Sequence, residues 1–212
     1  MFESIPMGTY KAIVADPPWH FKARTALQME NWNSRRDVEK HYPIMNIADI
    51  KAMPVSAMAG KDAHLFLWTT GPCLRMAFDV IEAWGFRYSA IAFTWVKLKR
   101  SINPAQLRIV PTQEADLHVG LGLTTRKNAE FCLLGRRGNA RREAKDVREI
   151  ILSPVREHSR KPEEAQDRIE RYCEGPYLEL FARRVRANWD SFGNEIGGFV
   201  PRGTLPLFGE EA

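Results

Sequence analysis

The chain has 212 residues, of which 44% are hydrophobic and 27% are charged, and its net charge is +5 at pH 7. This length and balance predict one globular domain with its own core, and the short apolar runs exclude a membrane-spanning helix. The three cysteines form no CxxC pair, the five histidines show no metal-binding spacing, and the first residues do not resemble a secretory signal. We therefore expect a cytoplasmic protein with reduced thiols and no metal site.

In chain order, apolar runs that predict buried strands alternate with amphipathic patterns that predict helices. Strands are expected at Ala12–Ala15, Leu65–Trp68, Phe86–Val96, Glu130–Leu134, Glu149–Leu152 and Tyr177–Ala182. Helices are expected over residues 46–53, between Pro72 and Gly85, and from Pro162 onward, where two glutamates place negative charge in the first turn. This alternation predicts an α/β fold with a mostly parallel sheet.

Two segments, His20–Tyr42 and Leu98–Thr125, lack regular patterning. Unpatterned segments of this length in a compact domain are usually functional or disordered. The chain contains no internal repeat, low-complexity tract or linker that would divide it, so residues 1–212 are expected to form a single domain.

Basic residues are concentrated between residues 135 and 161, a stretch that begins with Arg136 and Arg137, and between residues 97 and 108. Such a surface would attract a polyanion such as nucleic acid. A solvated, salt-bridged surface would have the same composition. Charge alone therefore leaves both interpretations open.

The segment AIVADPPW, residues 12–19, ends a predicted strand with one acid, two prolines and a tryptophan. Ligands of α/β sheets bind at the carboxyl ends of strands, which makes Asp16 a candidate site residue. A carboxylate accepts two hydrogen bonds, and the prolines lack N–H groups, so we expect the carbonyls of this segment to be rigid, unpartnered acceptors. Such acceptors suit an exocyclic amine, because holding both N–H bonds makes the nitrogen a better nucleophile.

Trp19 offers a face on which a purine can stack, an interaction worth about 1–3 kcal/mol per base. The alternative for these four residues is a turn that is stiffened by proline and capped by a buried tryptophan. The DPPW segment alone does not decide between the two.

With DPPW after an apolar strand, the chain resembles the amino-methyltransferases whose signature is Asp/Asn/Ser-Pro-Pro-Tyr/Trp/Phe, and more specifically the MT-A70-type adenine methyltransferases. Further stretches resemble that family in the same order: HYPIMNIADIKAMPV, DAHLFLWTTGPCLRMAFDVIEAWGF, RKNAEFCLLGRRGN, REHSRKPEE, YLELFARR and NWDSFGNE. The resemblance runs from about residue 10 to 197, which leaves residues 198–212 as a short tail.

The resemblance implies a Rossmann-like methyltransferase fold with a mostly parallel central sheet, helices on both faces and the catalytic motif ahead of the cofactor strand. It also implies S-adenosylmethionine as cofactor and nucleic acid as substrate, with methyl transfer to the N6 amine of adenine. DNA is expected rather than RNA. A homodimer and a heterodimer both remain open, and no membrane association is expected.

By the family pattern, the DPPW motif would be catalytic. Asp16 would hold the target amine and lie near the methionine end of the cofactor, while Pro17 would offer its carbonyl. Pro18 and Trp19 would shape the base pocket. Lys161 matches a family lysine that lies near both the cofactor carboxylate and the target base.

The resemblance also assigns cofactor contacts near the end of the chain. Arg183 and Asn194 match residues around the cofactor ribose, and Glu195 stands where the family has Gln or Glu. The segment after the cofactor strand is two residues shorter than in relatives with a His-Asn pair, which makes Arg184 a candidate partner of the methionine carboxylate. Only fifteen residues precede the DPPW motif, so the upstream element whose acid reads the cofactor adenine in some relatives is expected to be missing or shortened, with Glu3 as a candidate replacement.

For the substrate, Glu130 matches an acid close to the target base, and Ser159 and Lys161 belong to the loop that resembles Ser-x-Lys-Pro. Residues 20–42 and 153–161 would close around an extruded base. Arg136 and Arg137 are expected to contact phosphates.

Structural roles remain open for three of the site residues. Lys161 could pair only with Glu157, Glu130 could be a solvated strand residue, and Asn194 could be a turn residue. Three rival functions also remain: adenine N6 methylation of RNA, an inactive nucleic-acid-binding partner subunit, and cytosine N4 methylation, which uses the same amine geometry.

Overall fold

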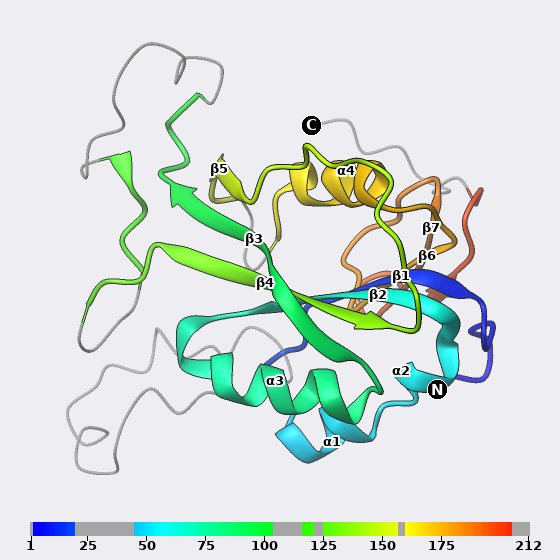
Figure 1. Ribbon diagram of the computed structural model, residues 1–212. Helices are drawn as coiled ribbons and strands as arrows, with labels where there is room; N and C mark the ends of the chain where they lie inside the picture. The colour runs from blue at the N-terminus through cyan, green and yellow to red at the C-terminus, as the bar shows by residue number, and fades with distance from the viewer. Residues whose placement is uncertain (1, 20–44, 104–115, 121–124, 157–159, 205–212) are drawn as a thin grey trace.

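A computed structural model describes residues 2–19, 45–103, 116–120, 125–156 and 160–204 of the chain (Figure 1). Ser159, Glu157 and the segment His20–Tyr42 lie outside the described residues, as does much of the segment Leu98–Thr125. In the described part, no helix has the length and apolar character needed to cross a bilayer.

The described strands form one sheet in the order β5-β3-β4-β2-β1-β6-β7-β8. Their bounds are β1 Tyr10–Ala15, β2 Ala59–Thr69, β3 Arg87–Leu98, β4 Ala129–Arg137, β5 Ile150–Pro154, β6 Tyr177–Leu180, β7 Trp189–Gly193 and β8 Gly198–Val200. Parallel pairing joins β1 to β2 and β6, β6 to β7, and β3 to β5. Only β4 and β8 run against the other strands of this sheet, which is therefore mixed but mostly parallel.

Helices cover both faces of this sheet (Figure 1). They are α1 Ile47–Ala52, α2 Val55–Met58, α3 Leu74–Ala83, which follows the short 3₁₀ turn η4 Gly71–Cys73, and α4 Glu163–Tyr172. Helices α1, α2 and α3 lie on one face, and α4 lies on the other. The chain thus has the predicted α/β architecture.

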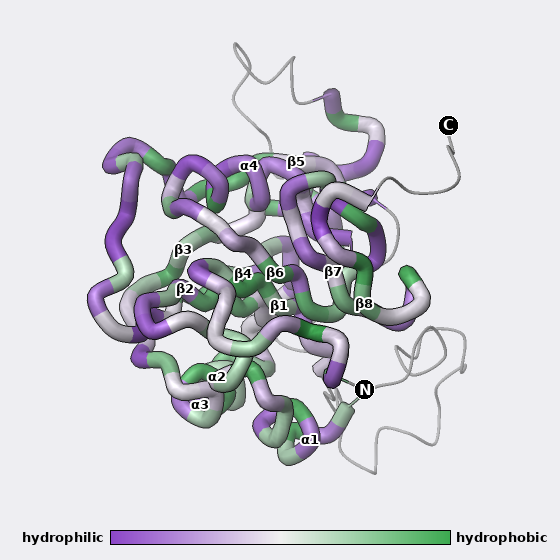
Figure 2. The backbone as a smooth tube through the Cα atoms, turned by 90° about the vertical axis from the view of Figure 1, so that its right-hand side faces the viewer, coloured by the Kyte–Doolittle hydropathy of each residue, from purple (hydrophilic) through white to green (hydrophobic). Residues whose placement is uncertain are grey.

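The alternation of side chains along β1 builds a core on each face. Ile13 and Ala15 pack in the cluster that contains residues of α1, α2 and α3, while Ala12 and Val14 pack in the cluster that contains residues of α4. Both clusters follow from the two-residue period of a strand that is buried on both sides. Figure 2 shows the hydrophobic strands at the centre of the fold and hydrophilic segments around them.

All six predicted strands and all three predicted helices are present in the structure. The sequence analysis did not predict α2, β7 and β8. Helix α2 has only four residues and begins after Pro54, so it is too short to show a helical period. Strand β7 reads WDSFG, and Asp190 interrupts its apolar pattern, so the segment does not look like a buried strand. Asp190 can be buried because its carboxylate accepts hydrogen bonds from the Tyr10 hydroxyl and the backbone N–H of Arg202.

The direction of β4 determines which residues lie near the DPPW motif. We call the edge where β1, β2, β3, β5, β6 and β7 end the carboxyl edge, and the opposite edge the amino edge. Because β4 is antiparallel to β2, Phe131 pairs with Thr69 near the carboxyl edge, whereas Arg137 pairs with Ala63 toward the amino edge. The start of β4, with Glu130, therefore lies at the same edge as Asp16.

Candidate active site

The DPPW motif leaves β1 at the carboxyl edge and is tied to its neighbours by backbone hydrogen bonds. The N–H of Trp19 donates to the Pro17 carbonyl at 2.8 Å, and the N–H of Met45 donates to the Pro18 carbonyl at 3.1 Å. The expectation that the carbonyls of this segment are unpartnered was therefore wrong for these two. Each carbonyl oxygen has two lone pairs, so each can accept a second hydrogen bond in addition to the one it accepts from the described residues.

Trp19 joins the motif to the end of β2. Its indole Nε1 donates to the Trp68 carbonyl at 3.0 Å, and the side chain is half-buried against the core. This bond fixes the plane of the ring while the residue keeps part of its surface exposed.

Asp16 forms an ion pair with Lys161, which comes from the residues just before α4. The distance from Lys161 Nζ to Asp16 Oδ2 is 2.5 Å, and the two side chains are only 16% and 25% exposed. The structure thus brings together two residues that are 145 positions apart in the sequence. Both had been singled out by the family pattern.

Glu130 lies on the other side of Lys161. Its Oε2 is 3.2 Å from Lys161 Nζ, its Oε1 accepts from Lys97, and its side chain is 14% exposed. A solvated strand residue would not be this buried, so that alternative is excluded. Lys161 also lies over the Trp68 ring, with Nζ 5.6 Å from the ring centroid.

Burial and neighbouring charges shift the pKa values of this group in different directions. Burial raises the pKa of Asp16, and the Lys161 ammonium opposes that shift. Burial by itself would lower the pKa of Lys161, but the two carboxylates raise it above its usual value. Burial by itself would raise the pKa of Glu130, but Lys161 and Lys97 hold it below its usual range. At neutral pH the structure therefore favours charged Lys161 and Glu130, and Asp16 is the carboxyl group that protonates more readily.

A pocket opens beside Asp16, between the ends of β1 and β6 and the start of α4. Its lining carries charges of both signs and two aromatic side chains, and includes Asp16, Trp68, Lys161, Glu179, Phe181, Arg183 and Arg184. The predicted catalytic acid and three predicted cofactor residues thus share one cavity.

Two residues of this pocket, Glu179 and Phe181, had not been singled out by the sequence analysis. Burial raises the pKa of Glu179 to about 7, although Arg184 and the amide of Gln166, which donates to it at 2.6 Å, oppose the shift. The sequence did contain a signal for Glu179, because this residue is an acid inside an apolar strand. Phe181 has a φ of 62°, a left-handed conformation that residues other than glycine adopt mostly at special sites. No sequence pattern predicts that angle.

The remaining predicted cofactor residues are arranged in two groups. Arg183 pairs with Glu195 at 3.2 Å, and Asn194 is exposed next to them at the end of β7. The carbonyl of Asn194 accepts from the N–H of Gly197 at 3.2 Å, as in a turn. Arg184 instead donates to Glu163 at the start of α4.

Glu163 is shared by three arginines. Arg156 and Arg160 lie 2.7 and 2.8 Å from the same oxygen that accepts from Arg184. Although burial opposes the shift, Arg184 and Arg156 lower the pKa of Glu163 to about 2. Two of these three arginines, Arg160 and Arg184, line the pocket that contains Asp16.

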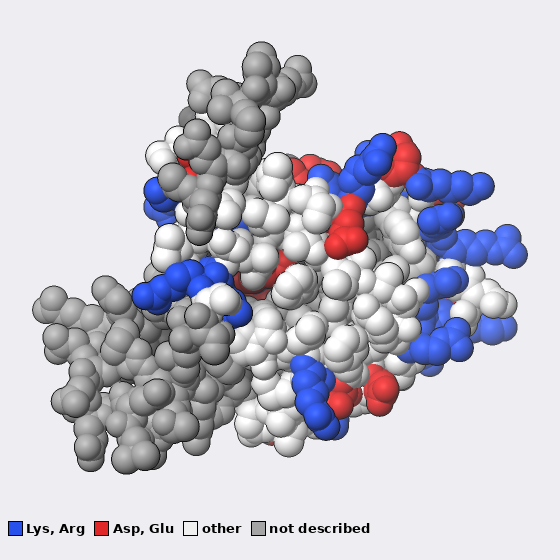
Figure 3. Space-filling view, turned by 60° about the vertical axis from the view of Figure 1, so that its left-hand side comes forward, with Lys and Arg blue, Asp and Glu red and all other residues white. Residues whose placement is uncertain are grey.

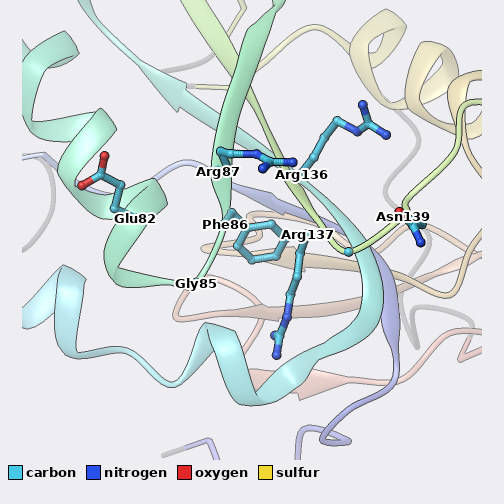
Figure 4. Close-up of a pocket in the computed structure, with 8 residues that line it drawn as sticks. Glu82, Gly85, Phe86, Arg87, Arg136, Arg137 and Asn139 are labelled. Carbon is cyan, nitrogen blue, oxygen red and sulfur yellow. The ribbon is translucent and has the colours of Figure 1, made fainter.

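The structure does not bring Arg136 and Arg137 to this site. They end β4 at the amino edge, where Arg136 donates to the Ala140 carbonyl at 2.5 Å and Arg137 donates to the Ser56 carbonyl at 2.6 Å. Figure 4 shows the separate pocket that they line, in which Arg87 lies near Arg136 and Arg137 points away from them. In Figure 3, the lysines and arginines of one face gather mainly along one margin of the molecule.

Comparison with known proteins is consistent with the arrangement of this site. The sequence model of the MT-A70 family matches residues 10–195. A type II methyltransferase, M.MunI, from Mycoplasma sp is 29% identical over 92% of this chain and 82% of its own length.

Longer relatives match this chain over only part of their length. An N(6)-adenosine-methyltransferase MT-A70-like protein from Arabidopsis thaliana is 30% identical over 91% of this chain and 24% of its own length. The human N(6)-adenosine-methyltransferase catalytic subunit METTL3 is 28% identical over 91% of this chain and 29% of its own length. Since the family model covers the DPPW motif, the carboxyl edge and the strands that carry the pocket, the chain belongs to the MT-A70 family.

Proposed function

We propose that this chain transfers a methyl group from S-adenosylmethionine to the N6 amine of adenine in DNA. The observation that carries the proposal is the buried Asp16 carboxylate, which ends β1 and is held by Lys161 beside a pocket of mixed charge. The likeness to a type II methyltransferase over 82% of that protein's length favours DNA as the polymer.

Asp16 and Pro17 supply the acceptors that the chemistry requires. One N–H of the amine donates to the Asp16 carboxylate, and the other donates to the Pro17 carbonyl, whose oxygen can accept a second hydrogen bond besides that from Trp19. These two bonds hold the nitrogen in a geometry in which its lone pair is less delocalised into the adenine ring. The carboxylate then stabilises the positive charge that develops on nitrogen during the transfer.

The lining of the pocket fits S-adenosylmethionine, whose methionine end carries both an ammonium and a carboxylate. Glu179 and Asp16 would bind the ammonium, and Arg184 would bind the carboxylate. The cofactor supplies the methyl group on a positively charged sulfur. A mostly parallel sheet with this pocket at its carboxyl edge supports a Rossmann-like methyltransferase fold.

The ribose contacts proposed for the cofactor rest on the family pattern together with one contact of the structure. Arg183 lines the pocket and pairs with Glu195, and Asn194 lies next to that pair. We propose that these three residues bind the ribose hydroxyls.

In duplex DNA the adenine must leave the base stack before it can reach Asp16. Trp19 is half-buried at the entrance to the carboxyl edge and offers a ring against which the extruded base can stack. Lys161 contributes by holding the Asp16 carboxylate in place, and it also lies within reach of the base.

The test of this function is methyl transfer to matched DNA and RNA oligonucleotides that contain adenine, followed by mass spectrometry of the product nucleosides. We expect N6-methyladenine from the DNA. Asp16→Ala should abolish transfer while the thermal unfolding midpoint stays close to that of the wild type. Asp79→Ala, which removes an exposed acid of α3, is the matched control and should retain full activity.

The same assay separates the rival functions. The relatives that are named N(6)-adenosine-methyltransferases favour RNA as the second candidate, and methylation of the RNA alone would establish it. N4-methylcytosine as the only product would overturn the base assignment. Absence of product from both polymers would indicate an inactive partner subunit, against which the intact Asp16–Lys161 pair argues.

A further inference from the structure

Four charged side chains of alternating sign lie in contact along the carboxyl edge. Lys97 donates to Glu130, Glu130 is 3.2 Å from Lys161, and Lys161 is 2.5 Å from Asp16. We call Lys97, Glu130, Lys161 and Asp16 the charge row. Its members come from the end of β3, the start of β4, the residues before α4 and the end of β1. Nothing in the family pattern used above assigns Lys97 a role.

Lys97 is held in place on several sides, unlike an ordinary surface lysine. Its backbone N–H donates to the Asn128 carbonyl at 2.8 Å, and its own carbonyl accepts from the N–H of His118 at 2.8 Å. Its ammonium lies 4.8 Å from the centroid of the Trp95 ring, and the side chain is only 20% exposed. Strand β3 therefore directs this ammonium at Glu130.

The balance of charge explains why a second lysine is needed. Lys161 contacts two carboxylates, so Lys161, Asp16 and Glu130 alone would carry a net charge of −1 in a buried site. In such a site either Asp16 or Glu130 takes up a proton, or both carboxylates stay ionised and share the single Lys161 ammonium. Lys97 makes the charge row neutral with both carboxylates ionised.

We propose that Lys97 is a positioning residue of methyl transfer, which neutralises Glu130 and so keeps Lys161 on an ionised Asp16. In this role Lys97 acts through its contact with Glu130. The inference rests on the proposed function, because it concerns the ionised state of the carboxylate that binds the amine.

Several other titratable groups face the charge row and must be considered in any pH dependence. Lys97 and Glu130 face His118, and burial lowers the pKa of that histidine, so it is neutral at pH 7. Asp16 faces Arg183, Glu179 and the buried thiol of Cys132. All of these groups are present in every variant described below, but Lys97 also lowers and Glu130 raises the pKa of His118, so the kcat profile can include a change in His118. The NMR titration of Asp16 described below separates the effect on Asp16 from that change.

The first experiment measures the pH dependence of kcat for the wild type, Lys97→Met and Lys97→Arg. Without Lys97, Asp16 should protonate at higher pH, so we expect Lys97→Met to lose about tenfold in kcat at pH 6.5 and less than about twofold at pH 9. Lys97→Arg keeps the charge and should restore most of the activity. Lys61→Met, which removes an exposed lysine near the amino edge, is the matched control and should follow the wild-type profile.

A double variant separates charge balance from packing. In Lys97→Met/Glu130→Gln both charges of the outer pair are removed, so Lys161 and Asp16 again form a neutral pair. We expect the pH at which kcat falls on the acidic side to return toward its wild-type value, even if Glu130→Gln raises KM. A loss in Lys97→Met that is equal at all pH values, or that the double variant does not reverse, would overturn the proposal.

A second measurement does not depend on activity and therefore distinguishes this inference from the proposed function. The carboxyl carbon of Asp16 can be followed by NMR in protein labelled with ¹³C-aspartate, with Asp16→Asn identifying the signal. We expect its titration midpoint to move to higher pH in Lys97→Met and to return in the double variant. If the wild type shows no methyl transfer but the midpoint moves, the proposed function fails and the role of Lys97 stands. If the midpoint is unchanged, the role of Lys97 fails.

Discussion

At the scale of single residues, the charged and polar partners of each acid decide its protonation state, because burial raises the pKa of all three acids of this site. Asp16, Glu130 and Glu179 all lie near the carboxyl edge, but they differ in their partners. Two lysines keep Glu130 ionised, whereas burial raises the pKa of Glu179 to about 7 despite the opposing influence of Arg184, Arg186 and the Gln166 amide. The family pattern singled out Asp16 and Glu130. It did not single out Glu179, because neither the burial nor the partners of that acid can be read from YLELFA.

The first prediction concerns the stability of Glu179→Gln. Folded Glu179 keeps its proton up to about pH 7, whereas an unfolded glutamate loses it near its ordinary value of 4.5. The folded state therefore binds more protons between these pH values, and the free energy of unfolding of the wild type falls as pH rises through that window. Relative to the wild type, Glu179→Gln should gain stability between pH 5 and pH 8, on the order of 2–3 kcal/mol.

Urea denaturation of the cofactor-free protein at pH 5 and pH 8 measures this effect. Glu82→Gln, which changes an exposed glutamate of α3, should show no such dependence. Glu179→Gln should also bind S-adenosylmethionine more weakly by calorimetry, since it removes a carboxylate proposed to face the ammonium. An equal stability difference at both pH values would contradict the raised pKa.

At the scale of elements, the ends of helices and the directions of strands decide where side chains lie. Helix α3 ends where the sequence predicts, because Gly85 adopts a φ of 77° and its N–H donates to the Glu82 carbonyl at 2.9 Å. Strand β4 was predicted as a strand, but its direction was not. A strand has the same period in either direction, so only pairing with β2 and β3 could show that Glu130 lies near Asp16 and that Arg136 does not.

The second prediction concerns the end of α3. In Gly85→Ala the new Cβ would lie 2.8 Å from Ser56 Oγ, in a conformation that disfavours any side chain. We expect a loss of about 1–3 kcal/mol in the free energy of unfolding. Gly71→Ala is the matched control, because the φ of Gly71 is outside the left-handed region and an added Cβ would meet nothing within 4 Å. Equal effects of the two changes in urea denaturation would show that the geometry of Gly85 carries no special cost.

At the scale of the whole molecule, the sheet joins segments that are distant in the chain. Tyr10 at the start of β1 donates its hydroxyl to Asp190 of β7 at 2.7 Å, across β6. Burial raises the pKa of Tyr10, so the hydroxyl keeps its proton and remains a donor. This bond helps to hold the two strands that flank the proposed cofactor strand.

The third prediction concerns that bond. Tyr10→Phe leaves one oxygen of buried Asp190 without its donor, and we expect it to lower the free energy of unfolding by about 1–3 kcal/mol. Tyr88→Phe removes the hydroxyl of a tyrosine that is 41% exposed and should cost less than about 0.5 kcal/mol. Urea denaturation of both variants checks the difference. A similar cost for both would show that the contact between β1 and β7 adds nothing to stability.

The sequence by itself determined the α/β class, the six strands that carry clear apolar runs and the family, and it singled out Asp16, Lys161 and Glu130, which the structure brings together. These features depend on local periodicity and on ordered motifs, both of which can be read along a single chain. The role inferred for Lys97, the raised pKa of Glu179, and the separation of Arg136 from Asp16 were decided only by the tertiary structure. They depend on strand direction and on burial, which arise when distant segments pack together and which no single segment encodes.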